Sequence, residues 1–290
     1  MEIATSAPDL ATLERKCVDT RLALLKEIQV SGMGHYSSTL SIVEVLVSLY
    51  YGYLDVRPDE PTWANRDRLV LSKGHSCSAL YPILADLGFF DPSHLDTFTR
   101  LGSILGDHPD MKKVPGVDFS SGSLGHGLSV GVGMAIAQGL RRSNSRVVVI
   151  HGDGEQNEGQ VWEAAGYAGS HRLSNLLVVL DNNGIQVDGT NEEVLDFAPI
   201  ADKWRAFNWR VVEVDGHDIA ALRAAYAEYD ELRRVAEAKP TIIIAHTIAG
   251  RGVDFIVGDP AWHVGYLQGV DNEEAMRLVQ TMYPDVEVRS

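Results

Sequence analysis

The chain has 290 residues, 45% of them hydrophobic and 22% charged, and this composition predicts a protein with a well-packed core. Its formal net charge of −15 makes nucleic acids and anionic membranes poor partners, because both bind best to clusters of Lys and Arg. Two cysteines exclude a disulfide scaffold, and the N-terminal residues lack the basic and apolar regions of a signal peptide. No stretch reaches the roughly 18 apolar residues of a membrane span, so we expect a cytoplasmic protein.

The first predicted elements are helices at 8–30 and 40–51, which form an N-terminal helical extension over 8–52. Apolar β-branched runs too short for helices then predict five buried strands, at 68–72, 146–151, 175–181, 209–215 and 241–247. Further helical patterns lie at 76–87, 125–140, 159–170, 199–207, 218–237 and 272–282. This alternation without a linker predicts a single α/β domain over 1–290, a doubly wound, mainly parallel sheet of five or six strands with helices on both faces.

The helix predicted within 121–140 is unusual because it contains Gly125, Gly127, Gly131 and Gly133. Each glycine costs about 1 kcal/mol relative to alanine in a helix interior. Close packing against another helix or the sheet is the explanation that we favour, and direct contact with a ligand is the alternative. Such a helix also suits a subunit interface.

Polar loops follow all five predicted strands, and each contains glycine beside a polar or ionisable side chain. In chain order they read SKGHS, HGDGEQNEG, DNNGIQVDG, DGHD and HTIAGRG. Open parallel sheets bind ligands beyond the carboxyl ends of their strands. Together the five loops therefore predict a site at that edge of the sheet.

The GDG turn at 152–154 points to the chemistry of this site. Gly152 and Gly154 allow the backbone to approach a bulky anion, and N–H groups of the following helix point toward it. Asp153 would repel a phosphate group unless a cation such as Mg²⁺ lay between them. The next strand end supplies the further oxygens that such a cation needs, from Asn182, Asn183 and the carbonyl of Ile185.

GDG followed at this distance by NN resembles the thiamine diphosphate signature, and the surrounding sequence resembles the N-terminal half of transketolases. The likeness covers nearly all of the chain. It includes GHYSSTLSIVEVL at 34–46, WANRDRLVLSKGHSCSALYPIL at 63–84, GDHPD at 106–110, SGSLGHGLSVGVGMAIA at 121–137 and AHTIAGRGVDF…PAWHVG at 245–265. It implies a domain that binds the diphosphate end of thiamine diphosphate through Mg²⁺.

The resemblance also implies roles for individual residues. The metal ligands would be the side chains of Asp153 and Asn183 and the carbonyl of Ile185. Contacts to the cofactor would come from Gly152, Gly154, Glu155, Asn183, His75, His126 and Leu124. The family lines its substrate channel with histidines, which here are His35, His75, His108 and His263.

Three further side chains leave alternatives open. A glutamate at the position of Glu158 joins a proton relay between the two active sites of the family's dimer, whereas a solvated glutamate in a first helical turn is the alternative. Lys73 is either a phosphate contact or a surface charge. Cys77 is expected to be a buried small hydrophobe, since no base is paired with it. His151, His171 and His217 are expected to be structural.

By resemblance, the chain transfers a two-carbon ketol unit from a ketose or its phosphate to an aldose. A full transketolase continues into a pyrimidine-binding domain, which carries the glutamate that activates the cofactor. We therefore expect one subunit of a split transketolase, paired with a C-terminal-half subunit in an α₂β₂ assembly. The family's His-Pro-Gly is His35-Tyr36-Ser37 here, and its Trp-His-Gly is Trp262-His263-Val264-Gly265, so the acceptor need not be a common pentose phosphate.

Three other functions remain as alternatives. Deoxyxylulose-phosphate synthases and the α subunits of 2-oxo acid dehydrogenases share the GDG…N pattern, and their donor would be pyruvate or another 2-oxo acid. The third alternative is a non-catalytic scaffold that only binds the cofactor. The intact Asp153 and Asn183 and the channel histidines favour an enzyme over a scaffold.

Overall fold

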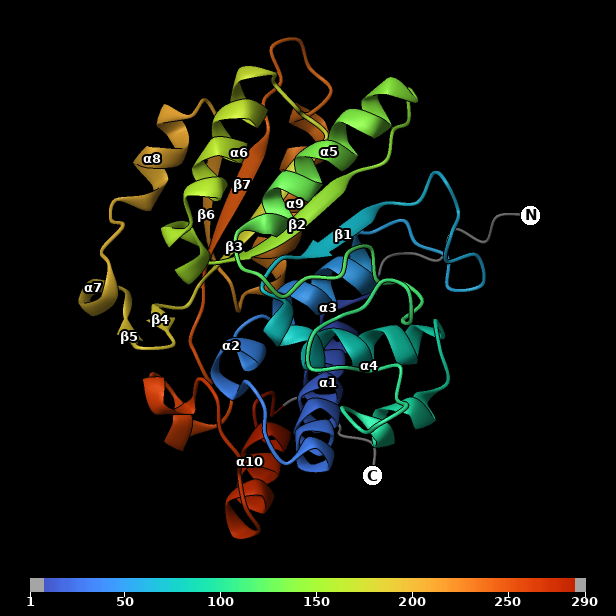
Figure 1. The fold of residues 1–290 in the computed structure, drawn as a ribbon, viewed down its shortest axis with the longest axis vertical. Helices are drawn as coiled ribbons and strands as arrows, with labels where there is room; N and C mark the ends of the chain where they lie inside the picture. The colour runs from blue at the N-terminus through green and yellow to red at the C-terminus, as the bar shows by residue number, and fades with distance from the viewer. Residues whose placement is uncertain (1–7, 285–290) are drawn as a thin grey trace.

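Five parallel strands form the central sheet of the computed structural model, which describes residues 8–284. They are β1 (Arg68–Leu71), β2 (Val147–Gly152), β3 (Leu176–Asn182), β6 (Arg210–Asp215) and β7 (Thr241–His246). Their order across the sheet is β1-β2-β3-β7-β6. Each strand coincides with one of the five predicted runs, so the parallel α/β fold expected from the sequence is confirmed (Figure 1).

The inner strands β2, β3 and β7 are mostly apolar because both faces of the sheet are covered. In β2, Val148 and Ile150 belong to one core cluster, whereas Val147 and Val149 belong to the other. Successive strand side chains point to opposite faces, so alternate residues pack against different helices. The sheet is therefore doubly wound, as predicted.

Helices lie on both sides of this sheet (Figure 1). One core cluster joins the sheet to α5 (His126–Leu140), α6 (Gly159–Ser170) and α8 (Ile200–Ala206). The other joins it to α1 (Leu10–Ser31), α3 (Val43–Gly52), α4 (Cys77–Leu87), α9 (Ile219–Leu232) and α10 (Val270–Gln280). Short 3₁₀ helices lie at Gly74–Ser76, Pro92–Thr97, Gly154–Asn157, Asp254–Ile256 and Pro260–Trp262.

The predicted N-terminal extension consists of α1, α2 (Tyr36–Leu40) and α3. The Asp9 carboxylate accepts a hydrogen bond from the Thr12 N–H and begins α1, and Gly32 ends that helix in the left-handed region at φ 77°. Buried residues of α1 and α3 share a core cluster with the sheet. The N-terminal helices are therefore packed into the core that supports the strand ends.

The chain departs from the sequence prediction in its shortest elements. Helix α2, helix α7 (Asn191–Val194) and the antiparallel pair β4 (Ile185–Gln186) and β5 (Gly189–Thr190) were not predicted. Elements of two to five residues are too short to show a periodicity. Helix α9 ends at Leu232 rather than near 237, because the chain must turn before Pro240, whose carbonyl accepts the Arg210 N–H at the start of β6.

The glycines of α5 let the helix lie directly on the sheet. A Cβ on Gly127 would overlap Ser72, and one on Gly131 would overlap the Val149 side chain. Close packing, the explanation favoured for the inner glycines, is confirmed at these two positions. Gly133 lies on the outer face of the helix, where a Cβ would meet nothing within 4 Å.

These two environments predict opposite effects of alanine. Gly131→Ala should lower the free energy of unfolding by about 1–3 kcal/mol, because its methyl group has no space against Val149. Gly133→Ala should raise it by up to about 1 kcal/mol through helix propensity alone. Urea denaturation of the two variants measures the difference, and equal stabilities would contradict this account of α5.

None of the helices that the structure describes combines the length and apolarity needed to cross a lipid bilayer.

Candidate active site

A cavity of about 370 Å³ opens beyond the carboxyl ends of β1, β2 and β3. The structure brings nearly all of the predicted site residues into its lining. They are His35, His75, His108, Leu124, Gly152, Asp153, Gly154, Glu155, Glu158, Asn183, Ile185 and His263. His126, at the start of α5, is exposed and lines neither this cavity nor the larger one beside it.

Asp153 follows the last residue of β2 and lies against the loop that carries Asn183 and Ile185. Its Oδ2 accepts hydrogen bonds from the Gly184 N–H at 2.6 Å and from Asn191 Nδ2 at 2.9 Å. Its Oδ1 accepts from the Gly154 N–H at 2.9 Å. The sheet explains this proximity, because Gly152 is paired with Asp181 on the neighbouring strand.

Burial raises the pKa of Asp153 to about 6, and the negative charge of Asp181 acts in the same direction. The hydrogen bonds from Asn191 and the Gly184 N–H oppose this shift. Only 5% of Asp153 is exposed, so solvent does little to offset its charge. A cation beside the carboxylate would stabilise its ionised form.

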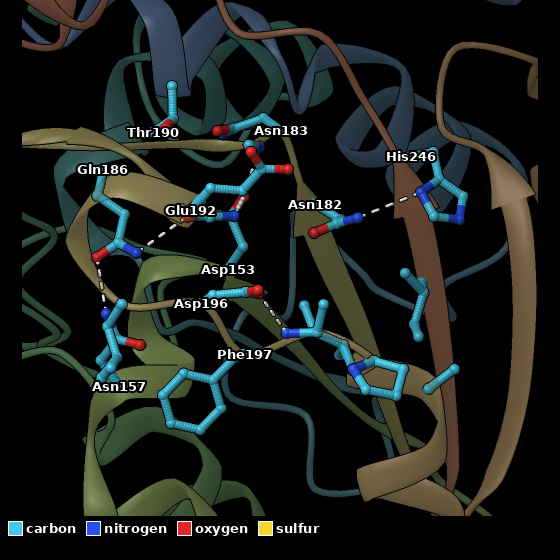
Figure 2. Close-up of a pocket in the computed structure, with 18 of the residues that line it drawn as sticks. Asp153, Asn157, Asn182, Asn183, Gln186, Thr190, Glu192, Asp196, Phe197 and His246 are labelled. Atoms are coloured by element: carbon cyan, nitrogen blue, oxygen red, sulfur yellow. Dashed lines mark hydrogen bonds between the residues drawn. The ribbon is translucent and has the colours of Figure 1, made fainter.

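The two asparagines left open by the sequence differ in whether they reach the 370 Å³ cavity. Asn183 lines this cavity and the larger one beside it, as Asp153 does, and its Nδ2 donates to Asp181 Oδ2 at 2.9 Å. Asn182 lines a cavity of about 870 Å³, where its Nδ2 lies 3.2 Å from His246 Nδ1. Figure 2 shows Asn182 facing His246 and directed away from Asp153. Of the pair, Asn183 is therefore the one placed beside the carboxylate.

Glu155 holds two loops together. Its Oε1 accepts hydrogen bonds from Ser72 Oγ at 2.5 Å and the Gly125 N–H at 2.8 Å, and its Oε2 accepts from the Gly152 N–H at 2.8 Å. Both carboxylate oxygens are engaged, and a diphosphate would repel them. Glu155 therefore fixes the loop backbones beside the cavity, and its contact with the cofactor stays a prediction.

Four histidines form a cluster in the lining of the cavity. The His35 ring centroid lies 5.1 Å from that of His75, 6.3 Å from that of His108 and 5.7 Å from that of His263. The His75 and His263 centroids are 5.5 Å apart. These residues come from four separate sequence motifs, and the fold brings them together as the resemblance implied.

Burial keeps the inner imidazoles neutral at pH 7. It lowers the pKa of His75 well below its ordinary value, and the Lys73 charge lowers it further. Burial also lowers the pKa of His35, although Asp107 opposes that shift, and it lowers the pKa of His263 to about 4. Each neutral ring offers one donor and one acceptor nitrogen.

Glu158 lies at the exposed rim of the cavity. It precedes α6, and its side chain forms no capping hydrogen bond there. A Cβ on Gly125 would stand 2.7 Å from Glu158 Cβ, so the glycine permits this close approach. The position leaves the carboxylate accessible from outside the chain.

The sequence analysis missed Asp181 and misplaced Lys73. The Lys73 side chain is 2% exposed and forms an ion pair with Asp181, which is 1% exposed. Lys73 is therefore neither a surface charge nor a free phosphate contact. The sequence did show that both residues stand at the ends of predicted strands. It could not show that they form a pair, because that depends on the order of the strands in the sheet.

Other residues expected to be structural are placed accordingly. Cys77 is buried, and its S–H donates to the Asp107 carbonyl at 3.2 Å. His151 is buried with its Nδ1 2.8 Å from Gln156 Nε2, and His217 Nδ1 lies 3.0 Å from Glu44 Oε2. His171 Nδ1 lies 3.0 Å from the Tyr167 carbonyl, near the end of α6.

Within residues 8–284, no group of three or more His, Cys, Asp or Glu side chains is arranged to hold a metal ion. The set around Asp153 contains one carboxylate, with amide and carbonyl oxygens as the remaining donors. Such a set resembles the oxygen environments that suit hard cations.

The sequence matches a family model described as "Transketolase, thiamine diphosphate binding domain" over residues 13–285. The chain belongs to the transketolase family. It corresponds to the family's N-terminal, thiamine diphosphate-binding part, and it is a transketolase-type transferase. The family, the enzyme class and thiamine diphosphate as the cofactor, all predicted from the sequence, are thereby confirmed.

The relatives are of two lengths. The chain is 44% identical to the 6-deoxy-6-sulfo-D-fructose transketolase subunit SqwG of Clostridium sp., over 84% of this chain and 87% of that protein. It is 39% identical to an apulose-4-phosphate transketolase subunit of Phocaeicola vulgatus, over 92% of this chain and 94% of that protein. The transketolase of Homo sapiens is 30% identical over 92% of this chain but only 41% of its own length.

Solved structures agree with this assignment. The transketolase of Campylobacter jejuni superposes with a TM-score of 0.86 at 28% identity, over 94% of this chain and 43% of that one. A Pichia stipitis transketolase in complex with sedoheptulose 7-phosphate gives a TM-score of 0.85 at 31% identity, over 91% of this chain and 40% of that one.

Proposed function

We propose that this chain is the N-terminal subunit of a two-component transketolase. It would transfer a two-carbon ketol unit from a ketose, or its phosphate, to an aldose-type acceptor, with thiamine diphosphate and Mg²⁺. The observation that carries the proposal is the cavity in which Asp153, Asn183 and the histidine cluster meet. Relatives that the chain matches over 87% and 94% of their length are named transketolase subunits, which supports a C-terminal-half partner.

The residues around Asp153 fit a hard divalent cation. Asp153 is a buried carboxylate without an ion-pair partner among residues 8–284, and the loop against it carries an amide and a carbonyl oxygen. In this proposal Asp153 and Asn183 Oδ1 hold Mg²⁺ with the carbonyl of Ile185. Gly152 and Gly154 line the same cavity, where a bare backbone can bind a diphosphate.

Thiamine diphosphate, when bound, supplies the electron sink for cleavage of the C–C bond. The chain's own contribution is to hold the diphosphate end and to line the substrate channel. Neutral His35, His75 and His263 can donate to and accept from sugar hydroxyls. The exposed His108 extends this lining toward the cavity mouth. Neutral rings suit hydroxyl groups better than a phosphate, so recognition of a substrate phosphate falls to the partner.

The remaining site residues have supporting roles in this proposal. Leu124 lines the cavity and would pack against the cofactor, and Glu158 at the rim would join a proton relay with a second active site. His126 would reach the diphosphate only through contacts formed in the assembly. We also propose an α₂β₂ assembly with α5 at a subunit interface, in the cytoplasm.

Reconstitution tests the two-component proposal. The chain alone should show little or no ketol transfer with a ketose phosphate and an aldose, and adding the C-terminal-half partner should restore it. Transfer is measured by product formation with thiamine diphosphate and Mg²⁺ present throughout.

The alternatives give different results in the same assay. Pyruvate as the preferred donor would favour a deoxyxylulose-phosphate synthase-like or dehydrogenase-type enzyme. Cofactor binding without turnover in any mixture would favour a scaffold. Strong ketol transfer by the chain alone would refute the two-component proposal.

A further inference from the structure

The Lys73–Asp181 ion pair spans the end of β2. Lys73 follows β1 and Asp181 lies in β3, and these strands flank β2. The lysine side chain passes Gly152 on the way, with its Cβ and Cδ 3.8 Å from where a Cβ on that glycine would stand. Both charges are almost completely buried, and an unpaired charge in such a place would be strongly destabilising.

Asp181 receives hydrogen bonds from four side chains. Its Oδ2 accepts from Lys73 Nζ, from Ser41 Oγ at 2.7 Å and from Asn183 Nδ2 at 2.9 Å, and its Oδ1 accepts from Thr247 Oγ1. These donors come from different segments, so the carboxylate is a junction between the strand ends.

This junction fixes the orientation of the Asn183 amide. An ionised carboxylate only accepts hydrogen bonds, so the amide must present its NH₂ group to Asp181. Asn183 Oδ1 then faces the other way, where it accepts from the Ile185 N–H at 3.0 Å. That is the side on which Asp153 binds the Gly184 N–H.

Lys73 also holds the segment that carries His35. Its Nζ donates to the Ser38 carbonyl at 3.0 Å, and Ser76 Oγ donates to the same carbonyl at 3.1 Å. The buried Lys73 ammonium therefore contacts both β3, the strand that leads to Asn183, and the segment that carries His35.

We propose that Asp181 and Lys73 are positioning residues for the metal site. Asp181 holds Asn183 with its amide oxygen directed toward the cation, and Lys73, which donates to the same Asp181 oxygen, holds this carboxylate in place and balances its charge. The inference rests on the proposed function, since it assumes that the cation binds at Asp153 and Asn183. Groups that orient metal ligands in this way typically change metal affinity about 10- to 100-fold when they are removed.

Titration of this chain with Mn²⁺ in the presence of thiamine diphosphate, followed by electron paramagnetic resonance, tests the proposal. Asp181→Asn keeps the side-chain shape but no longer dictates which end of the Asn183 amide faces it. Its Mn²⁺ affinity should fall about 10- to 100-fold. Lys73→Met should lower the affinity similarly, and Lys73→Arg should keep most of it.

Asp118→Asn is the matched control, because it breaks another buried ion pair, with Arg66 at 2.5 Å, away from the site. It should leave Mn²⁺ affinity unchanged. Wild-type affinity in Asp181→Asn and Lys73→Met would overturn the proposal, as would an equal loss in Asp118→Asn. If Asp181→Asn does not fold, the comparison of Mn²⁺ affinity between Lys73→Met and Lys73→Arg tests the proposal instead. Failure of the wild-type chain to bind Mn²⁺ with the cofactor would instead contradict the proposed function.

Discussion

Asp153→Ala should abolish the Mg²⁺-dependent binding of thiamine diphosphate while leaving the fold intact. The substitution removes the carboxylate that accepts the Gly184 N–H of the Asn183–Ile185 loop and lines the cavity. Without it, a cation bound at the proposed site would lose its charged ligand. We expect at least about a 100-fold loss of affinity, the upper end of what removing an outer partner of a metal ligand costs. Calorimetric titration with the cofactor, with and without Mg²⁺, measures it.

Asp188→Ala is the matched control, because Asp188 lines the same cavity from the exposed hairpin between β4 and β5. It should bind the cofactor and Mg²⁺ as the wild type does. Unchanged affinity in Asp153→Ala would remove that residue from the site, and circular dichroism shows whether the variant remains folded.

The same binding should weaken in acid. The pKa of Asp153 is raised to about 6, so the carboxyl is protonated below that pH and ionised above it. A protonated carboxyl does not ligate Mg²⁺, so metal affinity should be constant above pH 7 and fall about tenfold per unit below pH 6.

Arg21→Met should lower the free energy of unfolding by about 3–5 kcal/mol, the usual cost of breaking a buried ion pair by removing one partner. Arg21 and Glu44 are both fully buried, with Nη1 2.7 Å from Oε1 and Nη2 2.8 Å from Oε2. Glu44 also accepts from Tyr283 OH at 2.8 Å. The pair thereby joins α1, α3 and the segment after α10, and urea denaturation measures its loss.

The double variant Arg21→Met/Glu44→Leu separates the loss of the ion pair from the cost of leaving the Glu44 charge buried without Arg21. It removes both charges and should recover at least half of the lost stability. At the exposed Arg205–Asp202 pair, where the atoms are 2.8 Å apart, Arg205→Ala should cost less than about 1 kcal/mol. Equal losses of unfolding free energy at the two pairs would show that burial does not increase the contribution of the Arg21–Glu44 pair to stability.

The sequence predicted the elements whose residues repeat in a regular pattern. Val147 to Ile150 form an unbroken β-branched run because both faces of β2 are buried, and that alone marks a parallel strand. The β4–β5 hairpin and α7 were missed because each is a few polar residues long. Their placement beside Asp153 depends on contacts such as that from Asn191 Nδ2.

The candidate site was predictable where residues close in the sequence are also close in the fold. Asp153 and Asn183 follow strands that are consecutive in the chain, and those strands are also neighbours in the sheet. The Lys73–Asp181 pair was not predictable in this way. It joins residues on the two sides of β2, and only the order of the strands shows that they can meet.

The self-contained pairing of Lys73 has a consequence for substrate capture. Its charge is matched inside the protein by Asp181, and the inner histidines beside it are neutral, whereas the chain as a whole carries −15. Among the described residues, the cavity lining contains no exposed lysine or arginine, so a phosphorylated sugar diffusing toward this chain meets a repulsive field. In the two-component enzyme that we propose, long-range attraction of such a substrate would therefore originate on the partner, and the dependence of the association rate on ionic strength should report mainly on the partner's charges.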